Sequence, residues 1–492
     1  MSTSSGLLEL RSTQGRWVLA TTVMGTGVAM INGTDVSVAL PALDAELGAG
    51  VAALQWILNG YMLTLAALIL VGGSLGDRYG RRRVYILGVG WFAVASLACA
   101  VAPTVAWLIA ARIFQGAGAA LLTPGSLAII QSCFQPDDRP TAIGAWSGLT
   151  GIAAALGPLV GGVLVDSLGW RWIFVLPLPL ALGAMWTARR HVPESRDPSE
   201  GTLDVAGAML AIIALGGLSY PIISVPGRGW TPVSATAVAL GAVAVGAFVA
   251  RERSAANPML PLGVFSSRQF SAANLVTFVV YGALGGVFFL LVVHLQTVVG
   301  YSATSAGAAT IPIMALLLVG SPFAGRIATR LGPRLPLTVG PVMLGIGMLM
   351  MGRIPASAAY AAEVLPALVV FGLGLTVTVT PVTATVLAAV DDRHAGLASG
   401  VNNAVARTAQ LLAVAALPGL AGLRGGDFTD PAAFATGFGT AMSVAAGLSW
   451  MGAVIAWLFI SHDVLADVPE SEAFEQRHCG VEAPPSALAR PR

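Results

Sequence analysis

The segment Gly73-Ser-Leu-Gly-Asp-Arg-Tyr-Gly-Arg-Arg-Arg83 places four arginines and one carboxylate, Asp77, between two apolar runs. The runs cover residues 54–75 and 84–101, and each approaches the roughly 20 residues that a helix needs to cross a bilayer. We therefore predict a connecting loop at a membrane surface. So many arginines in one short connection favour the cytoplasmic side, and the simplest interpretation is a topology signal alone.

The composition extends this interpretation to the whole chain. The 492 residues are 56% hydrophobic and 10% charged, and the mean hydropathy is +0.79, whereas soluble domains carry about 25% charged residues. The apolar runs are too long for barrel strands of about 10 residues. We therefore predict an all-α integral membrane protein, because backbone groups in lipid must bond to one another.

We expect fourteen transmembrane helices with both termini in the cytoplasm. With that orientation 20 of the 26 basic residues fall on the cytoplasmic side and four on the other, and Arg112 and Arg407 lie within spans. This bias is the one that sets membrane topology. The expected spans are 17–40, 53–75, 84–103, 105–131, 141–166, 171–189, 204–225, 232–250, 270–297, 305–328, 335–354, 359–389, 396–421 and 434–461.

The residue inventory argues against several classes of function. All 26 basic residues are arginine, so the chain lacks the lysine of an ATP-binding P-loop and of a Schiff-base enzyme. The cysteines Cys99, Cys133 and Cys479 and the five histidines are scattered, without metal or disulfide spacing. We expect no enzyme activity, no cofactor, no metal, no ATP and no nucleic acid. A membrane-embedded transferase would need clustered acids or histidines, and a sensor would need a soluble effector domain.

A second basic segment, Gly325 to Arg334, repeats the first one, with Gly332 at the place of Gly80 and Thr329 at the place of Asp77. Such repeats indicate paired halves of a transporter. We predict an N-terminal six-helix bundle over 1–190, a cytoplasmic linker over 191–203, two inserted transmembrane helices over 204–253, a C-terminal six-helix bundle over 254–462 and a cytoplasmic tail over 463–492.

The motif Gly-x-Leu-Gly-Asp-Arg-x-Gly-Arg-Arg closely resembles the loop between the second and third spans of the major facilitator superfamily of secondary transporters. The stretch Arg112-Ile-Phe-Gln-Gly-Ala-Gly resembles the fourth span of proton-coupled drug antiporters, and Gly157-Pro158-Leu-Val-Gly161-Gly162 resembles the antiporter signature of exporting branches. Together they imply the fourteen-span drug:proton antiporter branch of that fold, in the cytoplasmic membrane.

This resemblance implies alternating access, in which two six-helix bundles rock around a midplane cavity. The protein would export hydrophobic drugs or antibiotics in exchange for protons, and its partners would be a small hydrophobic substrate, protons and membrane lipid. On the same fold, an exporter of a single dedicated metabolite or lipid, or an importer, stays open.

The proton-coupling residues are predicted to be Asp35 and Arg112. The segment Asn32-Gly-Thr-Asp-Val-Ser-Val-Ala-Leu-Pro41 resembles the family pattern Asp-x-Thr-x-Val-Asn-x-Ala-Leu-Pro, but Asn32 stands where the family has an acid. Asp35 lies about one helical turn away and could replace that acid. Alternatively, Asp35 faces the outer loop without a role and Arg112 forms a structural pair, in which case His294 or Glu363 would be the next candidate carriers.

Three further groups of residues carry predicted roles. The substrate cavity is expected to contain Asn32, Thr34, Asn59, Tyr61, Gln115, Asn403, Arg407 and Gln410. The cytoplasmic gating loop is expected to use Gly73, Asp77, Arg78, Gly80, Arg81 and Arg82, with Asp137 and Asp138 as candidate partners. The antiporter hinge is expected at Gly157, Pro158, Gly161 and Gly162, with Gly148 and Gly151 on the same helix. The alternatives are contact with lipid headgroups for the arginines and simple tight packing for the glycines.

Overall fold

The computed structural model of the protein describes residues 7–196, 204–255, 258, 260–390, 395–423 and 430–465. Within these residues the chain is helical throughout, and the one β-bridge pairs Leu8 with Phe134. The all-α prediction is therefore confirmed. The helices are α1 (Thr13–Leu47), α2 (Gly50–Tyr79), α3 (Arg81–Ala100), α4 (Val105–Cys133), α5 (Arg139–Leu168), α6 (Trp172–Val175), α7 (Pro177–His191), α8 (Val205–Arg228), α9 (Pro232–Ser254), η1 (Leu262–Ser266), α10 (Arg268–Thr297), α11 (Ala303–Ala309), α12 (Ile311–Leu331), α13 (Arg334–Met351), η2 (Tyr360–Val364), α14 (Leu365–Ala388), α15 (Ala395–Leu420), α16 (Pro431–Phe459) and η4 (His462–Leu465).

Most of these helices are long and apolar enough to cross a membrane. The described residues contain 13 such spans, three of which combine two consecutive elements: α6 with α7, α11 with α12, and η2 with α14. The 26-residue helix α15 lies outside that set, and the predicted count of fourteen stays a prediction. Pro177 begins α7 and Pro312 lies in the first turn of α12, positions at which proline fits a helix start.

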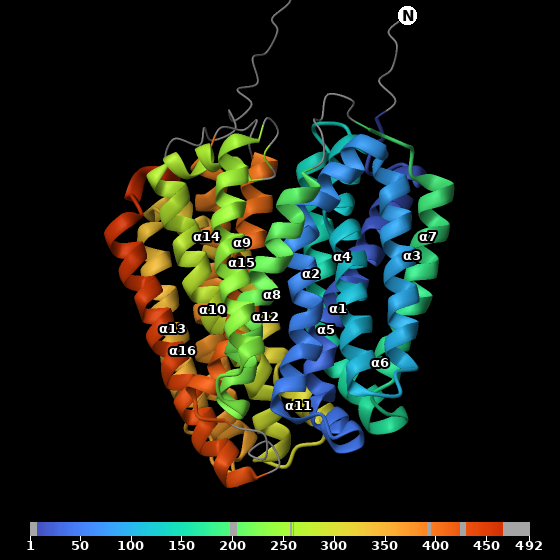
Figure 1. The fold of residues 1–492 in the computed structure, drawn as a ribbon. Helices are drawn as coiled ribbons and strands as arrows, with labels where there is room; N and C mark the ends of the chain where they lie inside the picture. The colour runs from blue at the N-terminus through green and yellow to red at the C-terminus, as the bar shows by residue number, and fades with distance from the viewer. Residues whose placement is uncertain are drawn as a thin grey trace, which may run out of the picture.

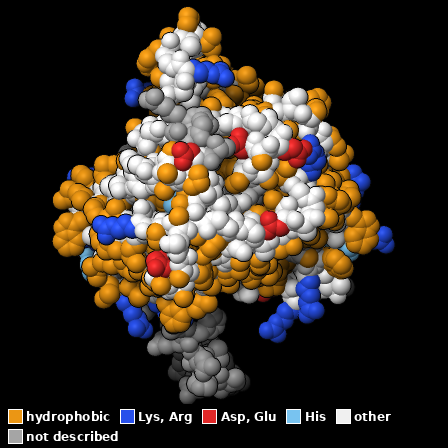
Figure 2. All heavy atoms as spheres, turned by 90° about the horizontal axis from the view of Figure 1, so that it is seen from below, with side chains coloured by type: hydrophobic (Ala, Val, Ile, Leu, Met, Phe, Trp, Pro, Cys, Tyr) orange, Lys and Arg blue, Asp and Glu red, His pale blue; other side chains and the backbone are white. Residues whose placement is uncertain are grey.

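The helices form two groups side by side (Figure 1). Helices α1 to α7 make one group and α10 to α16 the other, with α8 at the front of the junction in contact with α2 and α15, and α9 packed on α8. The junction of α2 and α3 and that of α12 and α13 lie at the same end of the molecule, which we call the basic face. The other end, which carries α11 and the α8–α9 turn, is called the opposite face. Figure 2 shows the opposite face, where few charged side chains stand among hydrophobic and uncharged ones.

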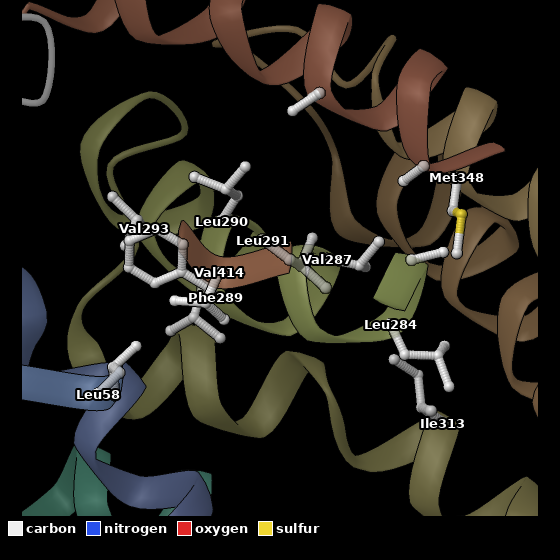
Figure 3. Packing of buried hydrophobic residues seen from close by; sticks show 14 of the residues in the cluster. Leu58, Leu284, Val287, Phe289, Leu290, Leu291, Val293, Ile313, Met348 and Val414 are labelled. Carbon is white, nitrogen blue, oxygen red and sulfur yellow. The ribbon is translucent and has the colours of Figure 1, made fainter. Parts of the chain in front are cut away.

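The apolar core joins the two groups near the opposite face. One buried cluster includes Leu43 and Leu58 of the first group together with Leu290 and Val293 of α10, and Figure 3 shows Leu58 beside Phe289. A second cluster lies toward the basic face, and its fully buried members all come from helices α1 to α7 and the segments beside them. Burial of apolar surface therefore stabilises the contact between the two groups near the opposite face more than near the basic face.

The loop in the basic segment is shorter than predicted. Helix α2 continues to Tyr79 and α3 begins at Arg81, so Gly80 alone separates them. An ion pair across Gly80 joins the two helix ends: Arg81 Nε lies 2.6 Å from Asp77 Oδ1. Gly80 has a φ of 110°, and Gly332 in the second basic segment has a φ of 71°, a region that favours glycine.

Each of these two glycines contacts the segment that follows the last helix of its own group. A Cβ on Gly80 would lie 2.6 Å from Glu194 Oε1, and a Cβ on Gly332 would lie 2.3 Å from the carbonyl oxygen of His462. The Arg81 amide also donates to the carbonyl of Ser195 at 2.9 Å. The start of the predicted linker is therefore packed on the protein, while its residues 197–203 and the tail from 466 lie outside the described residues.

Candidate transport cavity

A cavity of about 190 Å³ lies between the two helix groups. Among the predicted cavity residues, Thr34, Tyr61, Arg407 and Gln410 line it. The other lining residues are mostly apolar: Ala29, Met30, Gly33, Ser37, Leu58, Met62, Leu65, Thr123, Pro158, Gly285, Phe288, Phe289, Val292, Thr310, Met314 and Val414. Arg407 is the one charged residue among them, so the lining suits an apolar compound that is neutral or carries an acceptor or anionic group.

The other predicted cavity residues lie elsewhere. Asn32 and Gln115 are buried behind the wall of the cavity, in contact with Arg112. Asn59 is also buried, and neither atom of its amide group has a hydrogen-bond partner among the described residues. Asn403 is exposed and lies nearer the basic face than Arg407. The helical spacing of Asn403, Arg407 and Gln410 predicts that they share one face of a helix. It does not predict how far along that helix the cavity extends.

Arg112 is buried within the first helix group and is held by three acceptors. Its guanidinium donates to Asn32 Oδ1, to Gln115 Oε1 at 2.6 Å and to the carbonyl of Ile57 at 3.0 Å. It also lies 4.4 Å from the centre of the Tyr61 ring, a distance that gives a cation–π contact. Tyr61 lines the cavity, so Arg112 lies directly behind the cavity wall.

Asp35 is fully buried on α1. Neither of its carboxylate oxygens has a hydrogen-bond partner among the described residues. The predicted pairing with Arg112 is therefore not made in this conformation, in which Arg112 bonds to the neutral Asn32 instead. The alternative in which Asp35 faces the outer loop does not fit this burial. An ionised carboxylate without a partner is costly in such surroundings, so this arrangement suits the protonated group.

Helix α5 contacts the acid-bearing helix with one side and the second group with the other. A Cβ on Gly157 would lie 2.1 Å from Thr34 Oγ1, and one on Gly161 would lie 2.8 Å from Asp35 Cβ. On the neighbouring side, a Cβ on Gly162 would lie 2.4 Å from the carbonyl oxygen of Ala303. Gly148 and Gly151, by contrast, have nothing within 4 Å. The close packing is confined to the part of α5 near Asp35.

The opposite face is closed by polar contacts between the groups. Asp166, near the end of α5, accepts the backbone amides of Ala303 at 3.1 Å and Thr304 at 2.8 Å, at the start of α11. Gln296 on α10 donates to the carbonyl of Val38 at 3.0 Å. No recognised motif contains Asp166 or Gln296, and their roles depend on which helices meet, so sequence reasoning missed both.

At the basic face the arginines use a partner that was not predicted. Arg82 Nε and Arg83 Nε lie 3.5 Å and 3.6 Å from Glu194 Oε2. Asp138 accepts the backbone amide of Leu10 at 2.8 Å, and its suggested pairing with the arginines stays a prediction. Glu194 follows α7, far from the arginines in sequence, and a folded chain is needed to show the contact.

The alternative proton carriers are placed away from the cavity. His294 is buried in the second group, where its ring stacks on Phe438 at 4.1 Å and its Nε2 lies 3.3 Å from the carbonyl oxygen of Ile354. Glu363 is exposed near the start of α14. Neither lines the cavity, and within the described residues no group of three or more metal-binding side chains comes together.

Comparison with known proteins adds to this geometry. The model of the Major Facilitator Superfamily matches residues 18–414. The chain is 36% identical over 389 residues to the multidrug resistance protein Stp of Mycobacterium tuberculosis (strain CDC 1551 / Oshkosh), covering 78% of this chain and 72% of that protein. It is 32% identical over 412 residues to the tetracenomycin C resistance and export protein of Streptomyces glaucescens, covering 83% and 76%. Its fold is similar to a crystal structure of a D-xylose-proton symporter, with a TM-score of 0.65 at 16% identity, over 91% of this chain and 98% of that chain.

Proposed function

Because the chain belongs to the major facilitator superfamily, we propose that it is a secondary transporter that exports hydrophobic drugs or antibiotics in exchange for protons. The observation that carries the proposal is the cavity between the two helix groups, lined by apolar residues and Arg407. The names of the two relatives, a multidrug resistance protein and a resistance and export protein, support export as the direction. The chemistry needs neither ATP nor a cofactor, because proton entry supplies the driving force.

The basic face is assigned to the cytoplasm, with both termini on that side of the cell membrane. The arginine bias supports this orientation. In that orientation the shared apolar core and the contacts of Asp166 and Gln296 close the outer side. The two groups, residues 1–190 and 254–462, are the bodies that rock, with the linker at 191–203, the inserted helices at 204–253 and the tail at 463–492.

Proton coupling is assigned to Asp35 with Arg112 as its partner in another state. A proton enters from outside onto Asp35, which removes its charge and permits the buried, unpartnered position that the carboxyl group has here. Arg112 then bonds to Asn32 and Gln115. Substrate entering from the cytoplasm favours release of that proton, and the ionised Asp35 again attracts Arg112 as the outer side opens.

The test uses membrane vesicles with the basic face outward, a respiration-driven proton gradient, and two fluorescent compounds, the neutral N-phenylnaphthylamine and the cationic ethidium. We expect the wild-type chain to move the neutral compound more readily, since Arg407 repels a cation in the cavity, and a protonophore to stop the movement. Asp35→Asn should abolish it. The matched control is Asp463→Asn, because the Asp463 side chain is 85% exposed. Full, gradient-dependent transport by Asp35→Asn would show that another group carries the proton.

A second candidate is a dedicated exporter of one metabolite on the same fold, which the name of the Streptomyces glaucescens relative favours. A wild-type chain that moves neither compound, yet dissipates the gradient when one particular metabolite is added, would establish this narrower function.

A further inference from the structure

A second hollow, of about 440 Å³, lies near the opposite face between α2, α8 and α15. Its residues come from both helix groups and from the first inserted helix. It is separate from the transport cavity: Gln55 Nε2 donates to the carbonyls of Val414 at 2.8 Å and Ala415 at 2.9 Å. Val414 lines the transport cavity and Ala415 lines this outer cleft, so Gln55 bonds to the part of α15 that lies between the two.

The inserted helix α8 lies across the junction of the two groups at this cleft. Tyr220 of α8 lies beside Trp56 of α2, with 6.3 Å between the ring centres. Farther along α8, a Cβ on Gly419 of α15 would lie 2.7 Å from Pro226 Cγ. The cleft is thus bounded by two surfaces that belong to different groups, with α8 as the outer wall, and the residues of α8 are more often half-buried than buried or exposed.

The walls of the cleft are mostly apolar, and its polar side chains are Gln55 of α2 together with Ser224 and Arg228 of α8. The apolar part is made by Val51, Ile109, Ile223, Pro418 and Leu423, together with the Trp56 and Tyr220 rings.

Two features of α8 point to a ligand. Arg228, its last residue, is exposed and lines the cleft, and among the described residues it makes no ion pair. The Ser224 hydroxyl is buried without a hydrogen-bond partner in the same part of the chain. Trp230, just beyond Arg228, is 68% exposed; tryptophan and arginine are typical of the membrane–water boundary.

We propose that this cleft binds one anionic phospholipid from the leaflet at the opposite face. The phosphate lies against Arg228, the Ser224 hydroxyl donates to an ester carbonyl, and an acyl chain follows the apolar walls. An anionic lipid is favoured because, among the described residues, the cleft lining contains one cation and no acidic side chain. A soluble anion would leave the apolar walls in contact with water, which is unfavourable.

The lipid would act as a wedge between the groups. The ends of α2 and α15 at this cleft must separate if the opposite face opens, and the acyl chain contacts both. This binding does not depend on which compound the protein transports, so the site can be tested without a transport measurement.

The experiment is native mass spectrometry of the purified full chain in detergent with added dioleoylphosphatidylglycerol or dioleoylphosphatidylethanolamine. We expect the wild type to retain one phosphatidylglycerol and to retain it in preference to phosphatidylethanolamine. Arg228→Gln should lower the retention by roughly tenfold, because a charge-assisted contact is lost. The control is Arg353→Gln, another exposed arginine expected on the same face that lines neither cavity. Ala53→Phe, which fills the cleft, should also release the lipid.

Equal retention of phosphatidylglycerol by Arg228→Gln and Arg353→Gln would overturn the proposal. Displacement of the lipid by millimolar glycerol phosphate would overturn it too, because the ligand would then be a soluble anion. Size-exclusion profiles of each variant show whether it is folded, and Ser224→Ala, a small change, provides a second and milder test: it should weaken retention while the profile stays unchanged.

Discussion

At the scale of single residues, the Arg112 guanidinium is held in place by several hydrogen-bond acceptors. Its guanidinium reaches Asn32, Gln115 and the carbonyl of Ile57 from different directions and stacks on Tyr61. A lysine keeps the charge but lacks the planar, forked donor geometry. The position therefore requires arginine for its shape as well as for its charge.

We predict that Arg112→Lys destabilises the protein and stops transport. At least one charge-assisted hydrogen bond is lost, each worth about 1.5–3 kcal/mol, and buried acceptors are left unpaired. Thermal unfolding in detergent should show the loss, and vesicle transport should fall to background. The control is Arg171→Lys, since Arg171 pairs with Glu46 at an exposed site, where ion pairs contribute about 0–1 kcal/mol. Equal melting temperatures for the two variants would contradict the argument.

The same residues show how far sequence reasoning reaches. The cost of an arginine in lipid was enough to single out Arg112 and to require a partner for it. The partner was predicted as Asp35, because opposite charges attract. The structure uses Asn32 and Gln115 instead, since the direction of each side chain depends on how α1, α2 and α4 pack. The glycines of the predicted hinge lie where α5 meets Asp35, and their role as a hinge stays a prediction.

At the scale of helices, α5 connects the surroundings of Asp35 to the contacts that close the opposite face. Gly157 and Gly161 lie against α1, while Pro158 and Gly162 lie against α11. These pairs are four residues apart and therefore occupy two neighbouring sides of one helix. Asp35 and α11 therefore contact the same stretch of α5, so a movement of α11 away from α5 would take place close to Asp35.

We predict that Gly162→Ala favours the state that is open at the opposite face. The added methyl group would meet the carbonyl oxygen of Ala303, and overpacking costs about 1–3 kcal/mol, which shifts a two-state equilibrium by roughly 5–150-fold. Spin labels at positions 167 and 305, on α5 and α11, should move apart. Gly148→Ala is the control because nothing lies within 4 Å of Gly148. An unchanged distance distribution for Gly162→Ala would mean that α11 yields without opening.

Helix boundaries were predicted less well than helix positions. Hydropathy marks where a helix leaves the apolar layer, but α2 and α3 continue beyond it to leave Gly80 as the only linking residue. The reason is local: Asp77 and Arg81 form an ion pair across the turn, so the backbone needs no loop to accommodate these charges.

At the scale of the whole molecule, the two groups make the same kind of contact at the end of their last helix. The glycine of each basic segment holds the stretch that follows the last helix of its group, Glu194 in one case and His462 in the other. The sequence repeat predicted the two loops but not these contacts, because the segments that meet lie more than 100 residues apart. Composition was sufficient to predict a membrane protein. The closure of the opposite face could not be predicted, because it depends on how the two groups pack against each other.

We predict that Gly80→Ala and Gly332→Ala each lower stability more than Gly169→Ala. All three glycines have positive φ, at 110°, 71° and 95°, so an alanine is strained at each by about 1–3 kcal/mol. Gly169 has nothing within 4 Å, whereas the other two contact Glu194 and the backbone of His462. The extra loss should appear as a lower melting temperature in detergent. In a Glu194→Ala background the excess at Gly80 should shrink; an excess of the same size there would assign it to the backbone alone.

The contact of Gly80 with Glu194 also has a consequence for how the chain is made. The basic segment is synthesised after two helices, but its partner emerges from the ribosome only after α7. During that interval Arg82 and Arg83 have no Glu194 to bind, and they remain available to the translocation machinery and to lipid phosphates as topology determinants. Residues 192–196 can dock on the basic segment only after all the helices of the first group have been made, and they are made before α8 and α9.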